Sequence, residues 1–197
     1  ANLQLHVALE RVDAVVLSHE HPDHWSDLEG WNIVLQHFLD RDGFPVYAPA
    51  GLKERTYDGM PTVAWHDVGD GHRVTIGTLD ATFSRTDHGP ETLAVRIEAG
   101  GRSLGYSADT GPGWSLEALG PGLDLSVCEA SLPTEQEGVT SHLSARQAGE
   151  QARAAGAARL VLTHLWPTID PDRARGEGAA AFGSDVEIAA IGARYEV

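Results

Sequence analysis

Residues 18–24 of the chain read Ser-His-Glu-His-Pro-Asp-His and hold four metal-ligating side chains within six positions. Alternate side chains of an extended segment point the same way, so His19 and His21 can reach one cation. Asp23 and His24 lie where the chain turns toward a helix, and they can address a second cation beside the first. The plainer reading, an exposed polar cluster at the start of a helix, gives no reason for such tight spacing. This run therefore predicts metal-dependent chemistry.

Three later segments supply residues of the same type. His88, Asp109 and His164 each follow a stretch that has strand character. Because ligands in α/β proteins collect at the carboxyl ends of strands, we expect these segments to converge. Taken singly, the histidines have a plainer reading as hydrogen-bonded residues of strand edges, and Asp109 as a turn former before Gly111. Together with the first run they make seven ligands, enough for two metal sites that share one bridging oxygen.

The elements that must position these residues follow from the hydrophobic pattern. Short apolar stretches predict strands at 13–18, 44–47, 123–129 and 159–163, and alternation around glycines predicts strand pairs at 74–83 and 93–106. Helical spacing predicts helices at 24–39, 51–57, 144–156 and 172–182, and residues 186–197 are expected to form a closing pair of strands. The apolar face of the first helix is expected to consist of Leu28, Trp31, Leu35 and Phe38. The order places βα units at both ends and antiparallel hairpins between them. It predicts a single mixed α/β domain over residues 1–197.

Composition narrows the classes of function. The 197 residues are 42% hydrophobic and 22% charged, as in ordinary globular proteins, and no apolar run approaches the ~18 residues of a membrane span. The formal charge of −15 argues against broad capture of nucleic acid or an anionic membrane surface. The single cysteine, Cys128, cannot form an internal disulfide, so a cytoplasmic setting is expected.

These motifs resemble the metallo-β-lactamase superfamily of hydrolases, in order from residue 13 to about residue 165. Four segments resemble its ribonuclease Z and phosphodiesterase branch, and especially actinobacterial enzymes related to ribonuclease Z: residues 106–110, 128–131, 141–144 and 160–164. The resemblance implies the αββα sandwich of that superfamily. Its N-terminal strands are expected to be missing or shortened here, because only eighteen residues precede His19.

The resemblance also implies a role for each site residue. One metal ion would be bound by His19, His21 and His88, the other by Asp23, His24 and His164, with Asp109 as the bridge. The catalytic residues would be Asp23, His142 and Glu129, where His142 contacts the phosphate and donates a proton, backed by Glu129. Imidazole and carboxylate ligands suit zinc, with manganese as the alternative. The plainer reading of His142 is a residue beside the Ser144 helix cap.

The spacing of the ligands bears on the substrate. His88 and Asp109 are only 21 positions apart, which leaves no room for the long arm by which the resembling ribonuclease Z enzymes grip tRNA. The expected function is therefore hydrolysis of small phosphodiesters, such as cyclic nucleotides, through a metal-bridging hydroxide. The expected partner is that small molecule, with neither a membrane nor tRNA, and a homo-oligomer would complete a shortened sheet.

Three alternatives remain open at this stage. An acyl hydrolase of the lactonase, thioesterase or glyoxalase II type would use the same pair of metals. A ribonuclease Z-type endonuclease would process RNA 3′ ends. A truncated, non-catalytic homologue is disfavoured by the full set of ligands. One departure from the branch is Ala108, which stands where the branch usually has glycine and adjoins the bridging Asp109.

Overall fold

The computed structural model describes residues 2–197, which form two compact units, Ala1–Asp70 and Gly71–Val197. The prediction of a single domain stays a prediction, and each unit is described by itself. Within the described residues, every helix is too short or too polar to cross a bilayer.

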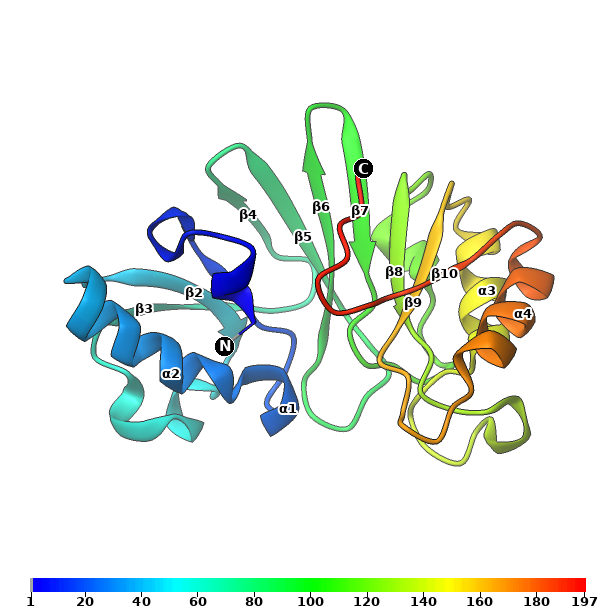
Figure 1. The fold of residues 1–197 in the computed structure, drawn as a ribbon, viewed down its shortest axis with the longest axis horizontal. Helices are drawn as coiled ribbons and strands as arrows, with labels where there is room; N and C mark the ends of the chain where they lie inside the picture. Colours follow the sequence, from blue (N-terminus) through cyan, green and yellow to red (C-terminus); the bar gives the residue numbers. More distant parts are fainter. Residues whose placement is uncertain (1) are drawn as a thin grey trace. The chain divides into compact units, whose positions relative to one another are not determined.

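The first unit is built on a small parallel sheet. Its strands are β1 (Val15–Val16), β2 (Phe44–Pro49) and β3 (Val63–Val68), in the order β1-β2-β3 with all pairs parallel (Figure 1). The helices α1 (Pro22–Trp25) and α2 (Asp27–Val34) follow β1, and a π-helical turn (Leu35–Leu39) continues α2. The arrangement is a strand, a helix and a parallel strand, which places the end of β1 beside the start of α1.

The helix of the first unit buries the face that its spacing predicted. Leu28, Trp31 and Leu35 lie in the core, and the Trp31 ring meets the Phe44 ring edge-on with centroids 5.4 Å apart. Phe38 was expected on the same face, but its side chain is 78% exposed. The wider π-helical turn rotates this residue away from the buried face, because its hydrogen bonds run from residue i to i+5.

The second unit is built on a seven-stranded mixed sheet in the order β10-β9-β8-β7-β6-β5-β4. The strands are β4 (Arg73–Ile76), β5 (Leu79–Arg85), β6 (Leu93–Ala99), β7 (Arg102–Tyr106), β8 (Leu125–Glu129), β9 (Leu160–Thr163) and β10 (Glu187–Ile188). Pairs from β4 to β7 are antiparallel, and pairs from β7 to β10 are parallel. The carboxyl ends of β5, β7, β8 and β9 carry the polar residues singled out above.

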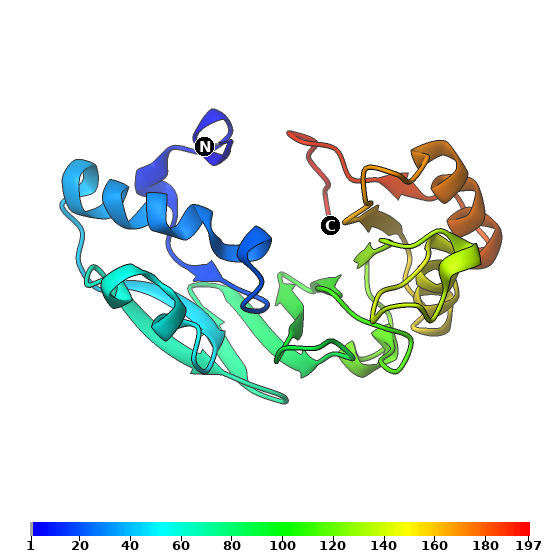
Figure 2. The ribbon, with the colours of Figure 1, turned by 90° about the horizontal axis from the view of Figure 1, so that it is seen from below.

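Two helices pack against β8 and β9. They are α3 (Ala145–Ala154) and α4 (Pro171–Phe182), which lie side by side (Figure 2). Close packing depends on Gly149, where a Cβ atom would come within 2.5 Å of the Gly178 carbonyl oxygen. In the core beneath them, burial raises the pKa of the Cys128 thiol to about 12, as expected of a small buried thiol.

Two predicted elements differ from the structure, and one strand was not predicted. The closing pair of strands is wrong: β10 pairs in parallel with β9, and residues 193–197 form no strand. The helix expected at 51–57 is replaced by two short 3-10 turns, Lys53–Arg55 and Tyr57–Gly59. Strand β3 was missed because its residues, Val-Ala-Trp-His-Asp-Val, do not alternate cleanly between apolar and polar.

Candidate metal centre

The first unit gathers its four candidate ligands around the turn between β1 and α1. His19 Nε2 and His21 Nδ1 lie 3.0 Å apart, and His24 Nε2 lies 3.4 Å from Asp23 Oδ2. The His19 and His24 ring centroids are 4.2 Å apart. Two atoms that are each about 2.1 Å from one zinc ion can lie up to about 4.2 Å apart, so both pairs have the spacing of shared ligands.

Local sequence explains this cluster. His21 has extended backbone angles and is the N-cap of α1, and Pro22 occupies the first helical position, where its fixed φ is favourable. The chain therefore changes from extended to helical between His21 and Asp23, which turns Asp23 and His24 away from the alternation of the preceding residues. His19 is fully buried, with Nδ1 3.0 Å from Ser18 Oγ.

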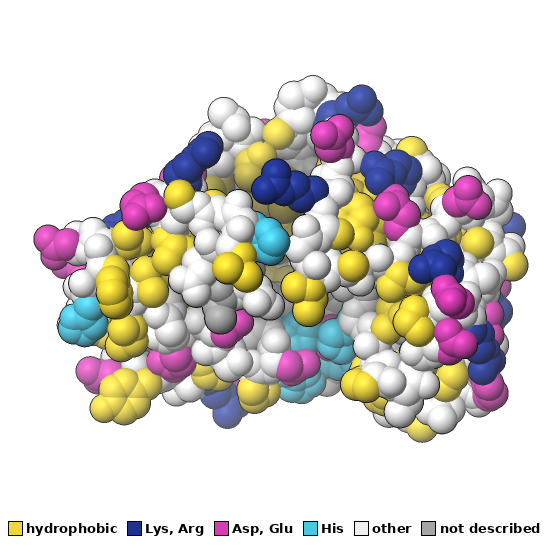
Figure 3. All heavy atoms as spheres, in the orientation of Figure 1, with side chains coloured by type: hydrophobic (Ala, Val, Ile, Leu, Met, Phe, Trp, Pro, Cys, Tyr) yellow, Lys and Arg dark blue, Asp and Glu magenta, His cyan; other side chains and the backbone are white. Residues whose placement is uncertain are grey.

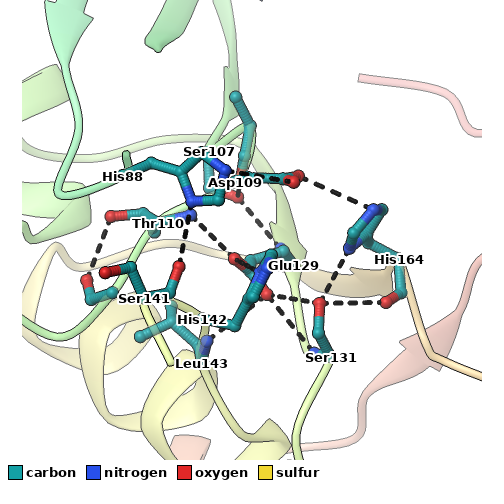
Figure 4. Close-up of polar contacts among 12 residues, drawn as sticks. His88, Ser107, Asp109, Thr110, Glu129, Ser131, Ser141, His142, Leu143 and His164 are labelled. Atoms are coloured by element: carbon teal, nitrogen blue, oxygen red, sulfur yellow. Dashed lines mark hydrogen bonds and ion pairs between the residues drawn. The ribbon is translucent and has the colours of Figure 1, made fainter. Parts of the chain in front are cut away.

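The second unit centres on Asp109, which is 2% exposed. Its two carboxylate oxygens face different imidazoles: Oδ2 lies 3.9 Å from His88 Nε2, and Oδ1 lies 3.8 Å from His164 Nε2 (Figure 4). These distances exceed a hydrogen bond but lie within the spacing of two ligands on one cation. A carboxylate that addresses one histidine with each oxygen has the geometry of a bridge.

Three bonds hold the Asp109 loop against the end of β5. Thr86 Oγ1 donates to the Asp109 carbonyl at 2.7 Å, and the Gly111 amide donates to the Asp87 carbonyl at 2.6 Å. The Gly113 amide donates to Asp87 Oδ2 at 2.8 Å. The loop that follows β7 is thus fastened to the loop that carries His88.

Two residues beside this loop have strained backbones. Ala108 has a φ of 52° and His164 a φ of 56°, both in the left-handed region. An L-residue pays about 1–2 kcal/mol there, and such strain collects at functional sites. The value at Ala108 explains why glycine suits this position, because glycine adopts a positive φ without a steric cost.

A second buried carboxylate, Glu129 at the end of β8, binds His142. Glu129 is 1% exposed, and its Oε1 lies 2.8 Å from His142 Nδ1. The Thr110 amide donates to the same oxygen at 2.7 Å. The His142 ring lies between two predicted ligands, with centroids 5.1 Å from His88 and 5.7 Å from His164. His142 is therefore oriented by Glu129 at the edge of the cluster.

The chemistry of the donor set fits a divalent cation. Within the second unit, single ligand atoms of Asp109, His142 and His164 all lie within 4.8 Å of one another. His88 Nδ1 lies 3.1 Å from the Ser141 carbonyl oxygen. Because a carbonyl oxygen can only accept a hydrogen bond, Nδ1 carries the proton, and the lone pair of Nε2 is the one that can bind a metal ion. Imidazoles held in this way, next to carboxylates, are ligands that zinc and manganese accept.

His88, Asp109, Glu129 and His164 lie at the ends of strands or in the loops that directly follow them. His19 and His21 lie between β1 and α1, Asp23 and His24 lie in α1, and His142 lies in the loop before α3. The structure brings the predicted residues together within each unit, and the sharing of ions between the units stays a prediction. Sequence reasoning assigned no role to Asp87 or Ser131, although both adjoin predicted residues. The sequence could have indicated the contact between Ser131 and Glu129. Ser131 lies two positions after Glu129, so the two side chains point to the same side of an extended segment.

Comparison with known proteins shows the family to which the chain belongs. A family model described as "Beta-lactamase superfamily domain" matches residues 2–165. The probable metallo-hydrolase YhfI of Bacillus subtilis (strain 168) is 31% identical over 200 residues, which cover 97% of this chain and 81% of the relative. A ribonuclease Z of Mycobacterium sp. (strain KMS) is 29% identical over 219 residues, covering 92% of this chain and 76% of the relative.

Solved structures agree with this relationship. The crystal structure of the metallo-beta-lactamase fold protein YhfI superposes with a TM-score of 0.88 at 29% identity, covering 98% of this chain and 82% of that one. The short form of human tRNase Z superposes with a TM-score of 0.69 at 19% identity, covering 81% of this chain and 75% of that one. At that identity the likeness to human tRNase Z concerns the fold alone.

Proposed function

The chain belongs to the beta-lactamase superfamily and is a metallo-hydrolase of that fold, and from this premise we propose that it hydrolyses small phosphodiesters such as cyclic nucleotides. The α/β fold predicted from the sequence is confirmed, as is the likeness to ribonuclease Z. The proposal for the substrate rests on one observation, the pair formed by His142 and the buried Glu129, 2.8 Å apart.

The proposed metal ligands combine the two clusters. His19, His21 and His88 would hold one zinc ion, Asp23, His24 and His164 the other, and Asp109 would bridge them. When bound, such ions supply Lewis acidity and an acidified water as nucleophile. The spacing of the pairs within each unit supports this assignment, because each pair has ligand atoms 3.0–3.9 Å apart.

His142 supplies the proton for the leaving group. Its Nδ1–H donates to Glu129, so the second ring nitrogen, Nε2, carries the transferable proton when the ring is charged. The carboxylate of Glu129 stabilises that charged ring and holds its orientation. As the P–O bond breaks, the leaving alkoxide takes the proton from Nε2, and His142 is left as the neutral Nδ1–H tautomer.

This pair favours phosphodiester over thioester hydrolysis. Cleavage of an alkyl phosphodiester expels an alkoxide, which needs a proton, and hydrolysis of a thioester expels a thiolate that leaves without one. Opening of a lactone also expels an alkoxide, so the pair weighs against the thioesterase and glyoxalase II types, and the comparison of substrates below tests the lactonase. RNA cleavage is the second phosphodiester alternative, in view of the relatives named ribonuclease Z. The charge of −15 weighs against it, and basic side chains on the face in Figure 3 are scattered among acidic ones.

The experiment compares leaving groups. The His142→Ala variant should lose about 10²–10⁴-fold in turnover of a 3′,5′-cyclic nucleotide, whose alkoxide needs the proton. It should lose much less with a p-nitrophenyl phosphodiester, whose phenolate leaves unprotonated. The exposed His72 lies in the same unit outside the site, and His72→Ala should leave both rates unchanged.

The outcomes separate the alternatives. Equal losses on both substrates would contradict proton donation by His142. Faster hydrolysis of lactones or thioesters than of any phosphodiester, with no effect of His142→Ala, would establish the acyl hydrolase instead. Preferential cleavage of precursor RNA would establish the ribonuclease.

A further inference from the structure

Ser131 lies between the buried carboxylate and a predicted metal ligand. The side chain is fully buried just beyond the end of β8. Its Oγ lies 2.6 Å from Glu129 Oε2, 2.7 Å from His164 Nδ1 and 3.1 Å from the His164 carbonyl oxygen (Figure 4). One hydroxyl thus has three neighbours and a single proton to donate.

The bonds of Glu129 decide where that proton goes. Backbone amides can only donate, and those of Thr110, Ser131 and Leu143 lie 2.7, 3.3 and 3.3 Å from the carboxylate oxygens. The carboxylate therefore acts as an acceptor on every side. A hydroxyl donates preferentially to a charged acceptor at short distance, so the Ser131 proton points at Glu129 Oε2.

The proton on His164 follows from this arrangement. Because the Ser131 hydroxyl has used its proton, it can only accept from His164 Nδ1, which must carry a hydrogen. His164 Nε2 is then left with its lone pair, and this is the nitrogen 3.8 Å from Asp109 Oδ1.

We propose that Ser131 is a positioning residue that fixes the Nδ1–H tautomer of His164 and relays the charge of Glu129 to it. The proposal rests on the assignment of His164 as a metal ligand, made above. Glu129 then orients two imidazoles, binding His142 through Oε1 and His164 through Oε2 and Ser131. His88 is held by a neutral carbonyl instead, so His164 is expected to be the more basic ligand of the two.

The test reads the tautomer directly in metal-free protein. Two-bond ¹H–¹⁵N correlation spectra of ¹⁵N-histidine protein at about pH 9, above the usual imidazole pKa of about 6.5, distinguish a protonated ring nitrogen from a bare one. His164, assigned by the signal lost in His164→Gln, should show Nδ1–H. In Ser131→Ala this preference should give way to the Nε2–H form that free imidazole favours, and His142 should be unchanged.

A second measurement reads the metal. Competition with a chelator should show zinc held about 10–100-fold more weakly at one site in Ser131→Ala, and Ser131→Thr should restore it by keeping the hydroxyl. Ser126→Ala is the matched control, since Ser126 is also fully buried on β8 and its Oγ has no hydrogen-bond partner among the described residues. It should change neither the tautomer nor the affinity.

Clear results would overturn the proposal. An Nε2–H tautomer of His164 in the unsubstituted protein would refute it, as would an Nδ1–H tautomer that survives Ser131→Ala. Neither result depends on the substrate. If the protein proved to be an acyl hydrolase, the phosphodiesterase assignment would fail and the role of Ser131 would be judged by the spectra alone.

Discussion

The two compact units build their ligand clusters in opposite ways. In Ala1–Asp70, four ligands lie within six consecutive residues and are brought together by a single turn, in which a strand gives way to a proline-initiated helix. In Gly71–Val197, His88, Asp109 and His164 are separated by tens of residues and meet because β5, β7 and β9 end at the same edge of one sheet. Local geometry makes the first cluster, and tertiary structure makes the second.

The difference extends to how the ligands are supported. The second cluster rests on Glu129, which accepts hydrogen bonds from three backbone amides and from two side chains. In the first cluster, His19 is contacted by its sequence neighbour, with Ser18 Oγ 3.0 Å from His19 Nδ1. A cluster assembled from distant segments needs such a network, because each loop would otherwise move independently.

The largest expected effect tests whether both clusters serve one reaction. His21→Ala in the first unit and His88→Ala in the second should each lower turnover about a thousandfold, because each removes several kcal/mol of charge stabilisation. Steady-state rates and metal content per chain provide the measurement. His37→Ala, at an exposed position of the first unit, should behave as the unsubstituted protein. Full activity after either ligand substitution would mean that one cluster works without the other.

A smaller effect tests the support of the second cluster. A Cβ atom at Gly113 would lie 2.6 Å from Asp87 Oδ2, so Gly113→Ala should displace that carboxylate and break its bond to the Gly113 amide. We expect a loss of about 1–2 kcal/mol in the free energy of unfolding, measured with denaturant.

Two further variants isolate the cause of that loss. Gly89→Ala lies in the loop that carries Asp87, with nothing within 4 Å of the added Cβ, and should lower the free energy of unfolding little. In an Asp87→Ala background, Gly113→Ala should cost little as well, because its partner is already gone. If the losses in the free energy of unfolding caused by Asp87→Ala and Gly113→Ala simply added, the bond between Asp87 and the Gly113 amide would not be the cause.

The smallest effect compares helix caps between the units. Asp170 caps α4 by accepting from the Asp172 and Arg173 amides at 2.9 and 3.5 Å, and Ser26 makes no side-chain bond as the cap of α2. Asp170→Ala should therefore lower the free energy of unfolding by about 1 kcal/mol, and Ser26→Ala should change it by a few tenths. Equal losses in the free energy of unfolding would show that the capping hydrogen bonds of Asp170 do not measurably stabilise the protein.

The sequence allowed the metal ligands to be proposed because their chemistry is carried by residue type and position. The run from His19 to His24 is informative by spacing alone. His88, Asp109 and His164 were recognisable only as a set, each after a strand, together with a family resemblance. Ser144 was likewise expected as a helix cap, and the structure adds Gln147, whose side chain completes a capping box with it.

What the sequence did not reveal depends on contacts between distant residues. The roles of Ser131 and Asp87 follow from which groups face them across the sheet, and serine and aspartate are common in turns for other reasons. The parallel pairing of β10 with β9 depends on the path of α4, which a short apolar segment cannot specify. Phe38 was misplaced because the helical period changes at a π-helical turn.

Anomalous diffraction from crystals of the zinc-loaded protein tests the central claim most directly. If the two clusters form one dinuclear centre, two metal peaks should lie about 3.5–4 Å apart, with Asp109 between them and histidines of both units around each. Peaks that lie far apart, or that are each bound by residues of one unit only, would contradict a shared centre and with it the proposed hydrolysis of phosphodiesters.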